Sequence, residues 1–189
     1  MDIGQCPSDK KHKKEMTEAI IIYGSRYGTA RRYAERLAEM TGIRCIGHKD
    51  LNKADGYERV IYVGALYAGS VLGLKALANA LSDQELIVVT VGLVDPQDEE
   101  NVRHIRQNIR SQIPARLYDE GKIFHLRGAI DYSTMGLKHR LMMAFVRSRL
   151  AKMPEDKLNA EARIILETYG KSVDFVDFDS LEAIKELIS

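Results

Sequence analysis

The chain of 189 residues is long enough for one domain with a core that needs no disulfide or metal. Its 28 basic and 27 acidic residues nearly balance, which excludes the strongly basic surface of a nucleic-acid-binding protein. Cys6 and Cys45 match neither a zinc motif nor a disulfide framework, and no apolar stretch approaches the roughly 20 residues that cross a bilayer. We expect a cytoplasmic protein with a flexible tail or leader at residues 1–15 and a single domain at residues 16–189.

The first half of the chain predicts three strands and one helix. The apolar run Ile20–Tyr23 is a strand, and Thr29–Met40 is an amphipathic helix closed by Gly42, as is common at helix C-termini. Ile43–Gly47 is a short second strand. Val60–Gly64 is continuous and β-branched, which is typical of a strand covered on both faces.

The second half continues the alternation of helices and strands. We predict a helix over Val71–Leu81, a strand over Leu86–Val91, a helix over Asp98–Ile113 and a strand over Ile123–Leu126. This alternation indicates parallel strands joined by right-handed crossovers. The expected fold class is therefore α/β, a doubly wound five-stranded parallel sheet with, by analogy, strand order 2-1-3-4-5.

The pattern changes after the fifth strand. Leu137–Met153 and Leu158–Tyr169 read as helices, Val173–Phe178 as an alternating strand, and Ser180–Ile188 as a final helix. We expect Val173–Phe178 to complete the fifth strand and the last helix to cover the sheet. Leu137–Met153 would then belong to an inserted helical excursion around the fifth strand.

The loop after the first strand carries the strongest functional signal. This loop and the start of the following helix consist of Ser25, Arg26, Tyr27, Gly28, Thr29 and Ala30. A helix N-terminus offers free N–H groups and a partial positive charge, so a small-residue loop there can hold a phosphate without a lysine. The hypothesis is a phosphorylated cofactor, and the alternative is an ordinary tight turn. The sequence contains neither a Walker P-loop nor the dinucleotide fingerprint.

Two more segments are expected at the same edge of the sheet, where open parallel sheets bind ligands. They are Ala65, Leu66, Tyr67, Ala68 and Gly69 after the third strand, and Val91, Gly92 and Leu93 at the end of the fourth. Small residues let the backbone approach a planar ligand. Tyr67 could stack on such a ligand or be a surface tyrosine in a loop. The histidines lack the spacing of metal ligands, so no metal site is expected.

These segments resemble the cofactor loops of the flavodoxin family, through Ile20–Gly28, Ile61–Ser70 and Val88–Asp95. The chain is most similar to the branch that includes bacterial menaquinone-dependent protoporphyrinogen oxidase, through Gly64–Gly69 and Phe124–Tyr132. The resemblance implies FMN, with its phosphate on the first loop and its ring between the second and third segments.

The first loop departs from the family pattern at two positions. Flavodoxins usually carry threonine or serine where this chain has Tyr27 and Ala30, whereas Ser25 and Thr29 keep their hydroxyl groups. Each missing neutral hydrogen bond is worth ~1 kcal/mol, so the affinity for FMN falls about tenfold per group.

The resemblance also implies an oxidoreductase that moves electrons from an organic, tetrapyrrole-type substrate to a quinone or another redox partner. Arg127, Asp131 and Tyr132 are the catalytic candidates because they follow the fifth strand, although Asp131 could instead cap a turn. The alternatives are a non-enzymatic FMN electron-transfer protein and a flavin-free interaction module.

The segment Lys138–Lys152 is rich in basic residues and contains no acidic one. Leu141 and Phe145 lie between its cations on a helical wheel. This pattern suits peripheral contact with the inner face of a membrane or with an acidic partner, and the alternative is a packed helix with solvated cations. The oligomeric state is left open.

Overall fold

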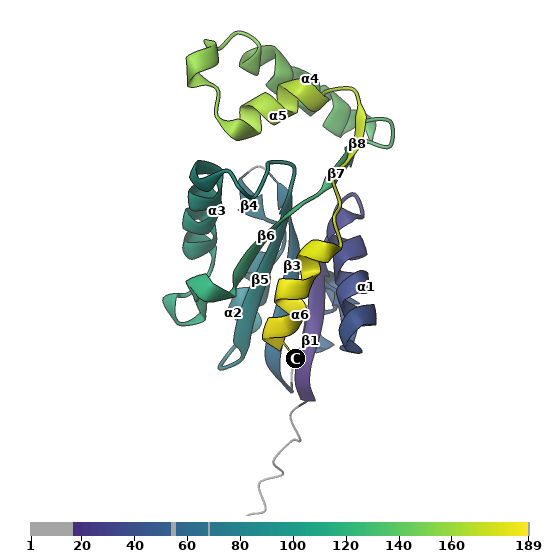
Figure 1. Ribbon diagram of the computed structural model, residues 1–189, viewed down its shortest axis with the longest axis vertical. Helices are drawn as coiled ribbons and strands as arrows, with labels where there is room; N and C mark the ends of the chain where they lie inside the picture. Colours follow the sequence, from purple (N-terminus) through teal and green to yellow (C-terminus); the bar gives the residue numbers. More distant parts are fainter. Residues whose placement is uncertain (1–16, 54–55, 68, 189) are drawn as a thin grey trace, which may run out of the picture.

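The computed structural model describes residues 17–53, 56–67 and 69–188 (Figure 1). The predicted tail at residues 1–15 and Ala68 lie outside the described residues. Five parallel strands form the central sheet: β1 (Thr17–Gly24), β2 (Cys45–Gly47), β3 (Tyr57–Tyr67), β5 (Glu85–Gly92) and β6 (Ile123–Arg127). Their spatial order is β2-β1-β3-β5-β6, which is the predicted order 2-1-3-4-5 of the parallel strands.

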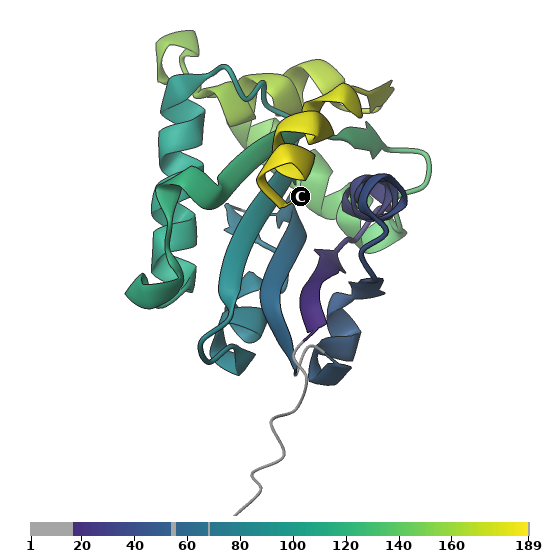
Figure 2. The same ribbon diagram turned by 60° about the horizontal axis from the view of Figure 1, so that its bottom comes forward.

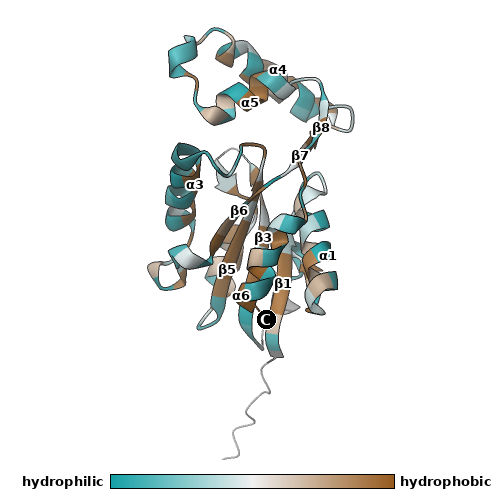
Figure 3. Cartoon of the chain, viewed as in Figure 1, coloured by the Kyte–Doolittle hydropathy of each residue, from teal (hydrophilic) through white to brown (hydrophobic). Residues whose placement is uncertain are grey.

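Helices cover both faces of this sheet. Side chains of β1 alternate between two apolar clusters, with Ile21 in one and Ile20 and Ile22 in the other. The cluster of Ile21 contains the buried faces of α1 (Thr29–Thr41) and α6 (Glu182–Ile188). The cluster of Ile20 contains those of α2 (Leu74–Ala80) and α3 (Glu99–Gln112). Burial on both faces explains why the strands are continuously apolar (Figure 3).

The helix ends follow the sequence signals. Gly42 has φ of 72° after α1 and donates its N–H to the carbonyl of Ala38, as predicted. The Asp98 carboxylate accepts the N–H of Asn101 at 2.8 Å and so caps α3. The four 3-10 turns η1 (His48–Lys53), η2 (Ala115–Leu117), η3 (Glu120–Lys122) and η5 (Asp179–Leu181) connect these elements.

The start of the second helix was predicted wrongly. The predicted range Val71–Leu81 begins as strand β4 (Ser70–Val71), which pairs antiparallel with the end of β3. Gly73, with φ of 81°, then starts α2. Val71 is 3% exposed as a strand residue, so burial satisfies its apolar side chain without a helix.

After β6 the chain leaves the sheet and forms a cap. The chain runs through β7 (Ala129–Asp131), α4 (Leu137–Leu150), η4 (Glu155–Lys157) and α5 (Ala160–Thr168), and returns through β8 (Ser172–Asp174) to α6. Figure 1 shows α4 and α5 beyond one end of the sheet, joined to it by β7 and β8. This confirms the predicted excursion, and Figure 2 shows α6 lying over the strands.

The expected completion of the fifth strand is wrong. Of the predicted strand Val173–Phe178, only Val173 and Asp174 are in β8, which pairs antiparallel with β7 in a separate two-stranded ribbon. The ribbon forms because the chain extends beyond β6 through Gly128, whose carbonyl accepts the N–H of Phe175 at 3.1 Å. The returning chain therefore pairs with this extension instead of entering the parallel sheet.

Tyr33 of α1 joins the sheet to the returning chain. Its hydroxyl donates to the carbonyl of Arg127 at 2.7 Å and accepts the N–H of Asp177 at 2.9 Å. The ring is fully buried and packs edge-on against Phe178, with 5.6 Å between ring centroids. Burial raises the pKa of the hydroxyl. One side chain thus satisfies backbone groups at the two points where the cap joins the domain.

We expect Tyr33→Phe to lower the free energy of unfolding by about 1–3 kcal/mol, because the carbonyl of Arg127 and the N–H of Asp177 lose a partner in a buried site. Urea unfolding measures this loss. Tyr57→Phe is the control, since Tyr57 is also buried and its hydroxyl makes no hydrogen bond within the described part of the chain. Equal losses in both variants would contradict the bridging role of Tyr33.

Candidate functional site

The first loop forms an open helix N-terminus. The Ser25 Oγ accepts the N–H of Gly28 at 3.0 Å, which closes the loop, and the Ser25 hydroxyl can still donate its own hydrogen. Gly28 has φ of 92° and stands before α1 without capping it through a side chain. The first N–H groups of α1 therefore point out of the helix without a capping oxygen from Gly28. Thr29 differs from Ser25, because its hydroxyl donates to the carbonyl of Ala129 at 3.4 Å.

The second segment is a hairpin and not the expected open loop. Ala65, Leu66 and Tyr67 belong to β3, and the hairpin pairs Leu66 with Val71 and Tyr67 with Ser70. Backbone pairing extends past the parallel sheet because Gly69, with φ of 75°, permits a tight turn. The hairpin holds Tyr67 in a fixed position at the edge of the sheet.

The third segment packs closely against the second. Val91 and Gly92 complete β5, and Leu93 follows it. A Cβ atom on Gly92 would lie 2.8 Å from the Leu66 Cδ1, so a side chain here would force the leucine of the hairpin to move. The Gly92 carbonyl also accepts the N–H of Gly128 at 2.6 Å, which places the exit of β6 beside it.

The structure brings most of the predicted cofactor residues together around one pocket of about 150 Å³. Eleven of the fourteen line it: Ser25, Arg26, Tyr27, Thr29, Ala30, Ala65, Leu66, Tyr67, Val91, Gly92 and Leu93. Gly28, the residue before α1, is not among the lining residues, Gly69 lines a neighbouring cleft, and Ala68 is outside the described residues. Three chain segments that are far apart in the sequence thus meet at the carboxyl ends of β1, β3 and β5.

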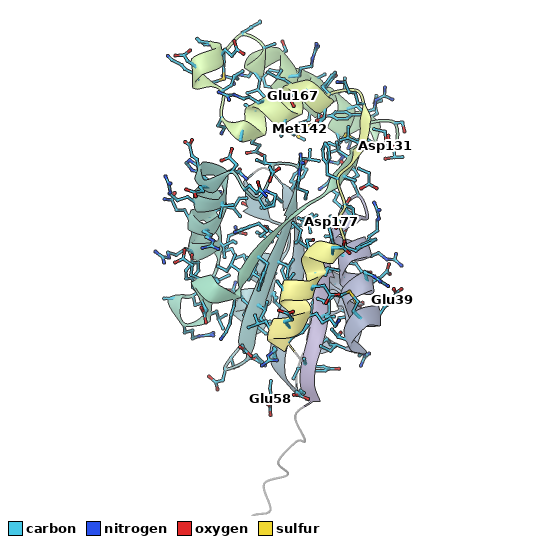
Figure 4. The ribbon with its side chains drawn as sticks, viewed as in Figure 1. Glu39, Glu58, Asp131, Met142, Glu167 and Asp177 are labelled. Carbon is cyan, nitrogen blue, oxygen red and sulfur yellow. The ribbon has the colours of Figure 1, made fainter. Side chains whose placement is uncertain are left out.

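The cap supplies a further wall of this pocket, and its methionines were not predicted to lie there. Met135, Met142 and Met143 line it together with His139 and the start of β7. Figure 4 shows Met142 on the side of α4 that faces the sheet. Methionines at helical spacing usually pack in a protein core, so the sequence did not identify these three as residues of a pocket wall.

Aromatic and cationic contacts hold α4 against the first loop. The Arg26 Nη2 lies 2.5 Å from the His139 Nε2, and its guanidinium lies 4.9 Å from the centroid of the Tyr67 ring. The rings of Tyr27 and Tyr67 are each edge-on to His139, at centroid distances of 6.1 and 6.2 Å. The Tyr67 hydroxyl also lies 3.7 Å from the Met142 Sδ. In this arrangement α4 covers the Tyr67 ring.

A second, larger cleft of about 340 Å³ adjoins the pocket. The two share six lining residues: Leu66, Tyr67, Gly92, Leu93, Met142 and Met143. The rest of the cleft lies between α3 and the cap, with Ile105, Val146 and Ile165 among its apolar walls and Asn101 and Asn108 among its polar ones. A ligand in the cleft would therefore touch the same side chains as a ligand in the pocket.

The three catalytic candidates do not line the pocket or the cleft among the described residues. The Arg127 Nε donates to the carbonyl of Leu93 at 3.3 Å, and its guanidinium stacks on Phe175 at 4.0 Å. The Asp131 carboxylate accepts the N–H and hydroxyl of Ser133 at 2.8 and 2.6 Å, which lowers its pKa and makes it a turn cap (Figure 4). Their positions outside the pocket and the cleft do not support catalytic roles, which stay predictions.

Tyr132 occupies a structural position between β7 and α5. It is 6% exposed, and its ring centroid lies 5.2 Å from that of Tyr169. Burial raises the pKa of its hydroxyl, so Tyr132 is a poor proton donor at neutral pH. The ring therefore packs the end of β7 against the residue that follows α5.

His125 lines the cleft and is part of a buried polar chain. Its Nδ1 lies 2.8 Å from the Thr90 hydroxyl, and its Nε2 accepts the Arg106 Nε at 3.3 Å. Burial, with the nearby Arg106 charge, lowers the pKa of His125 to about 4. The imidazole is therefore neutral at pH 7, which agrees with the apolar character of the cleft.

We expect the free energy of unfolding to fall by about 2 kcal/mol between pH 6.5 and pH 4.5, because in this window the unfolded chain binds a proton on His125 that the folded chain does not. Urea unfolding at several pH values measures this fall. His125→Gln should remove most of the dependence in this window, whereas His104→Gln, at an exposed histidine of α3, should retain it. Unchanged pH dependence in His125→Gln would contradict the buried neutral state.

Neither a metal site nor a membrane span is found in residues 17–53, 56–67 and 69–188. No three His, Cys, Asp or Glu side chains there are grouped to hold a metal ion. No helix there is long and apolar enough to cross a bilayer. The Cys45 thiol is half-buried, and burial raises its pKa to about 11, so it is not an activated nucleophile.

Comparison with known proteins gives a family match over most of the chain. A Flavodoxin domain family model matches residues 20–157, and no curated protein matches. A solved flavodoxin from Pseudomonas aeruginosa, a cysteine-to-serine mutant, is 19% identical with a TM-score of 0.42 and covers 59% of this chain and 84% of its own. The Trp repressor binding protein from Bacillus subtilis is 16% identical with a TM-score of 0.36, over 59% and 83% of the two chains. On the family match, together with the strand order described above, the chain belongs to the flavodoxin domain family.

Proposed function

We propose that the protein binds FMN in the pocket at the carboxyl ends of β1, β3 and β5, and that it is an oxidoreductase. The observation that carries the proposal is the convergence of eleven predicted cofactor residues on one pocket at the N-terminus of α1. The phosphate would be held by the N–H groups at the start of α1 and by the Ser25 hydroxyl. Bound FMN would supply the electron-transfer chemistry, taking up and releasing electrons singly or in pairs.

The residues of the first loop fit the phosphate of FMN, whereas the cap restricts the space for its ring. The pocket measures about 150 Å³, whereas typical ligand pockets hold ~300–1,000 Å³. The wall that can move outward is α4, because it contains no fully buried residue. Its His139 contacts Arg26 and Tyr27 of the first loop. FMN binding in this proposal displaces α4 outward and retains the backbone donors of the first loop.

The adjoining cleft favours an enzyme over an electron carrier. An electron carrier needs an exposed cofactor edge and a docking surface, but it needs no cavity for an organic molecule. Here a cleft of about 340 Å³ shares six lining residues with the pocket, so a substrate in it would lie beside the cofactor. The cleft is the feature that supports electron transfer to or from a bound organic substrate.

The lining of the cleft bears on the class of substrate. No lysine or arginine occurs among the described residues that line it, and His125 is neutral there. A neutral quinone or hydroquinone fits this lining better than a tetrapyrrole, whose carboxylates would need cations. We therefore propose a quinone as the substrate of the cleft, with a tetrapyrrole-type donor kept as the second candidate on the resemblance of Phe124–Tyr132. A cytoplasmic location is part of the same proposal.

Substitution of Gly28 tests the phosphate position. We expect Gly28→Asp to bind FMN about tenfold more weakly than Gly28→Asn, because the carboxylate repels the phosphate while both side chains have nearly the same shape. Both residues tolerate the positive φ of Gly28 better than other side chains do, and a Cβ there meets no atom within 4 Å. Titration with FMN, followed by flavin fluorescence, measures the two affinities.

Equal affinities of the two Gly28 variants would place the phosphate elsewhere. If the unaltered protein also failed to bind FMN, the flavin-free interaction module would be the better reading of the fold.

Filling the cleft tests the enzyme proposal. We expect Val146→Trp to raise the KM for a water-soluble naphthoquinone at least about tenfold in oxidation of the reduced FMN-loaded protein, because the larger ring occupies the cleft. Val146 does not line the FMN pocket, so the affinity for FMN should be unchanged. Val102→Trp on α3, outside the cleft, is the matched control. Unchanged KM in Val146→Trp would favour the electron carrier.

A further inference from the structure

The outer face of α4 exposes a stripe of large apolar side chains. Leu137, Leu141 and Phe145 are spaced four residues apart, so they lie along one side of the helix, and they are 72%, 65% and 63% exposed. They are among the most exposed large apolar residues of the described chain. Figure 3 shows hydrophobic segments on α4 although this helix lies outside the two core clusters.

Cations flank this stripe on both sides. At 100° per residue, Lys138 and Arg149 border it on the side of Phe145, and Arg140 and Arg147 border it on the side of Leu137. The sequence from 137 to 153 contains no acidic residue. The outer face therefore combines an apolar centre with a basic rim.

The cap does not need this stripe for packing. The opposite side of α4, with His139, Met143 and Val146, lines the pocket and the cleft and is half-buried. A helix at the surface of a domain normally buries one apolar stripe and exposes polar residues elsewhere. A second stripe on α4, at a cost in solubility, requires an external occupant.

We propose that the outer face of α4 binds an anionic lipid bilayer, with the helix lying parallel to the membrane at the level of the headgroups. Apolar side chains on one face and lysine or arginine along both borders are the composition of helices that lie in this interface. The chemistry also disfavours a second copy of the same face, because two-fold pairing of α4 would bring its cations together.

Docking in this orientation would place the pocket next to the membrane. Met142 and Met143 of α4 line both the pocket and the cleft, so the bilayer and the site would lie on opposite sides of one helix, about 10 Å thick. An apolar molecule dissolved in the bilayer would then have a short path to the cleft. This consequence rests on the proposed function, whereas the membrane contact itself does not.

Vesicle binding by the full chain tests the proposal without any flavin. We expect the protein to bind vesicles of phosphatidylcholine with 30% phosphatidylglycerol and to bind phosphatidylcholine vesicles much more weakly, with the difference lost at high salt. Leu141→Asp should lower the partition coefficient at least about tenfold, because a leucine that would enter the bilayer is replaced by a charge. Leu187→Asp on α6, an equally simple change at an exposed leucine, should leave it unchanged.

A second variant separates the charge from the apolar contact. Lys138→Gln combined with Arg149→Gln should weaken binding to the anionic vesicles about fivefold for each cation removed. The proposal is overturned if the unaltered protein does not bind anionic vesicles, or if Leu141→Asp binds them as well as Leu187→Asp does. It is also overturned if the unaltered protein binds polyglutamate but not vesicles. The last result would assign the face to an acidic protein, and none of these outcomes would change the FMN proposal.

Discussion

The close backbone contact around Gly128 is the constraint on which the cap and the pocket depend. Gly128 donates its N–H to the carbonyl of Gly92 and accepts the N–H of Phe175, so one residue joins the end of β5, the exit of β6 and the returning chain. A Cβ at this position would lie 3.0 Å from the Val91 Cγ1 and 3.4 Å from the Gly92 carbonyl. A side chain here would crowd these three backbones, and Tyr33 satisfies the neighbouring groups from the side of α1. The inserted cap is therefore fixed to the same sheet edge that carries the first loop, the proposed phosphate site.

This arrangement gives α4 two different faces. One side closes the pocket and the cleft through methionine and histidine side chains, and the other presents Leu137, Leu141 and Phe145 to the outside. Because apolar residues lie on both sides, no single stripe dominates the helix, and none of its residues is fully buried. The contacts of α4 are those of His139 with Arg26, Tyr27 and Tyr67, that of Arg147 with the Tyr169 ring, and its packing against α5, among others. Elements with few buried contacts open most readily, and the proposed entry of FMN under α4 requires such an opening.

The parts of the fold that the sequence predicted are those with a long and regular signal. The buried strands and α1 and α3 show period and end signals over many residues, and each lies within a few residues of its predicted place. The ribbon of β7 and β8 was missed because three-residue strands show no period, and β4 because Val71 fits a helix or a strand. The first loop and the open N-terminus of α1 were predictable from local chemistry, since their residues are consecutive. The cleft was not, because its walls come from β3, α3, α4 and α5, and no local pattern links them.

Arg127 was predicted as a catalytic residue for a similar reason, because the sequence does not show its contacts in the fold. The sequence shows that Arg127 comes directly after the predicted fifth strand. It does not show that the Arg127 Nε donates to the Leu93 carbonyl or that its guanidinium stacks on the Phe175 ring. With Arg127 engaged in this way, the cation nearest the pocket is Arg26, which lies against Tyr67 and His139. Any displacement of α4 that admits FMN separates Arg26 from His139 and frees its guanidinium beside the helix N-terminus. The energy of that lost contact opposes cofactor binding, and a charge-assisted contact of Arg26 with the phosphate would offset it. In the proposed FMN complex, Arg26 would therefore exchange its contact with His139 for one with the phosphate.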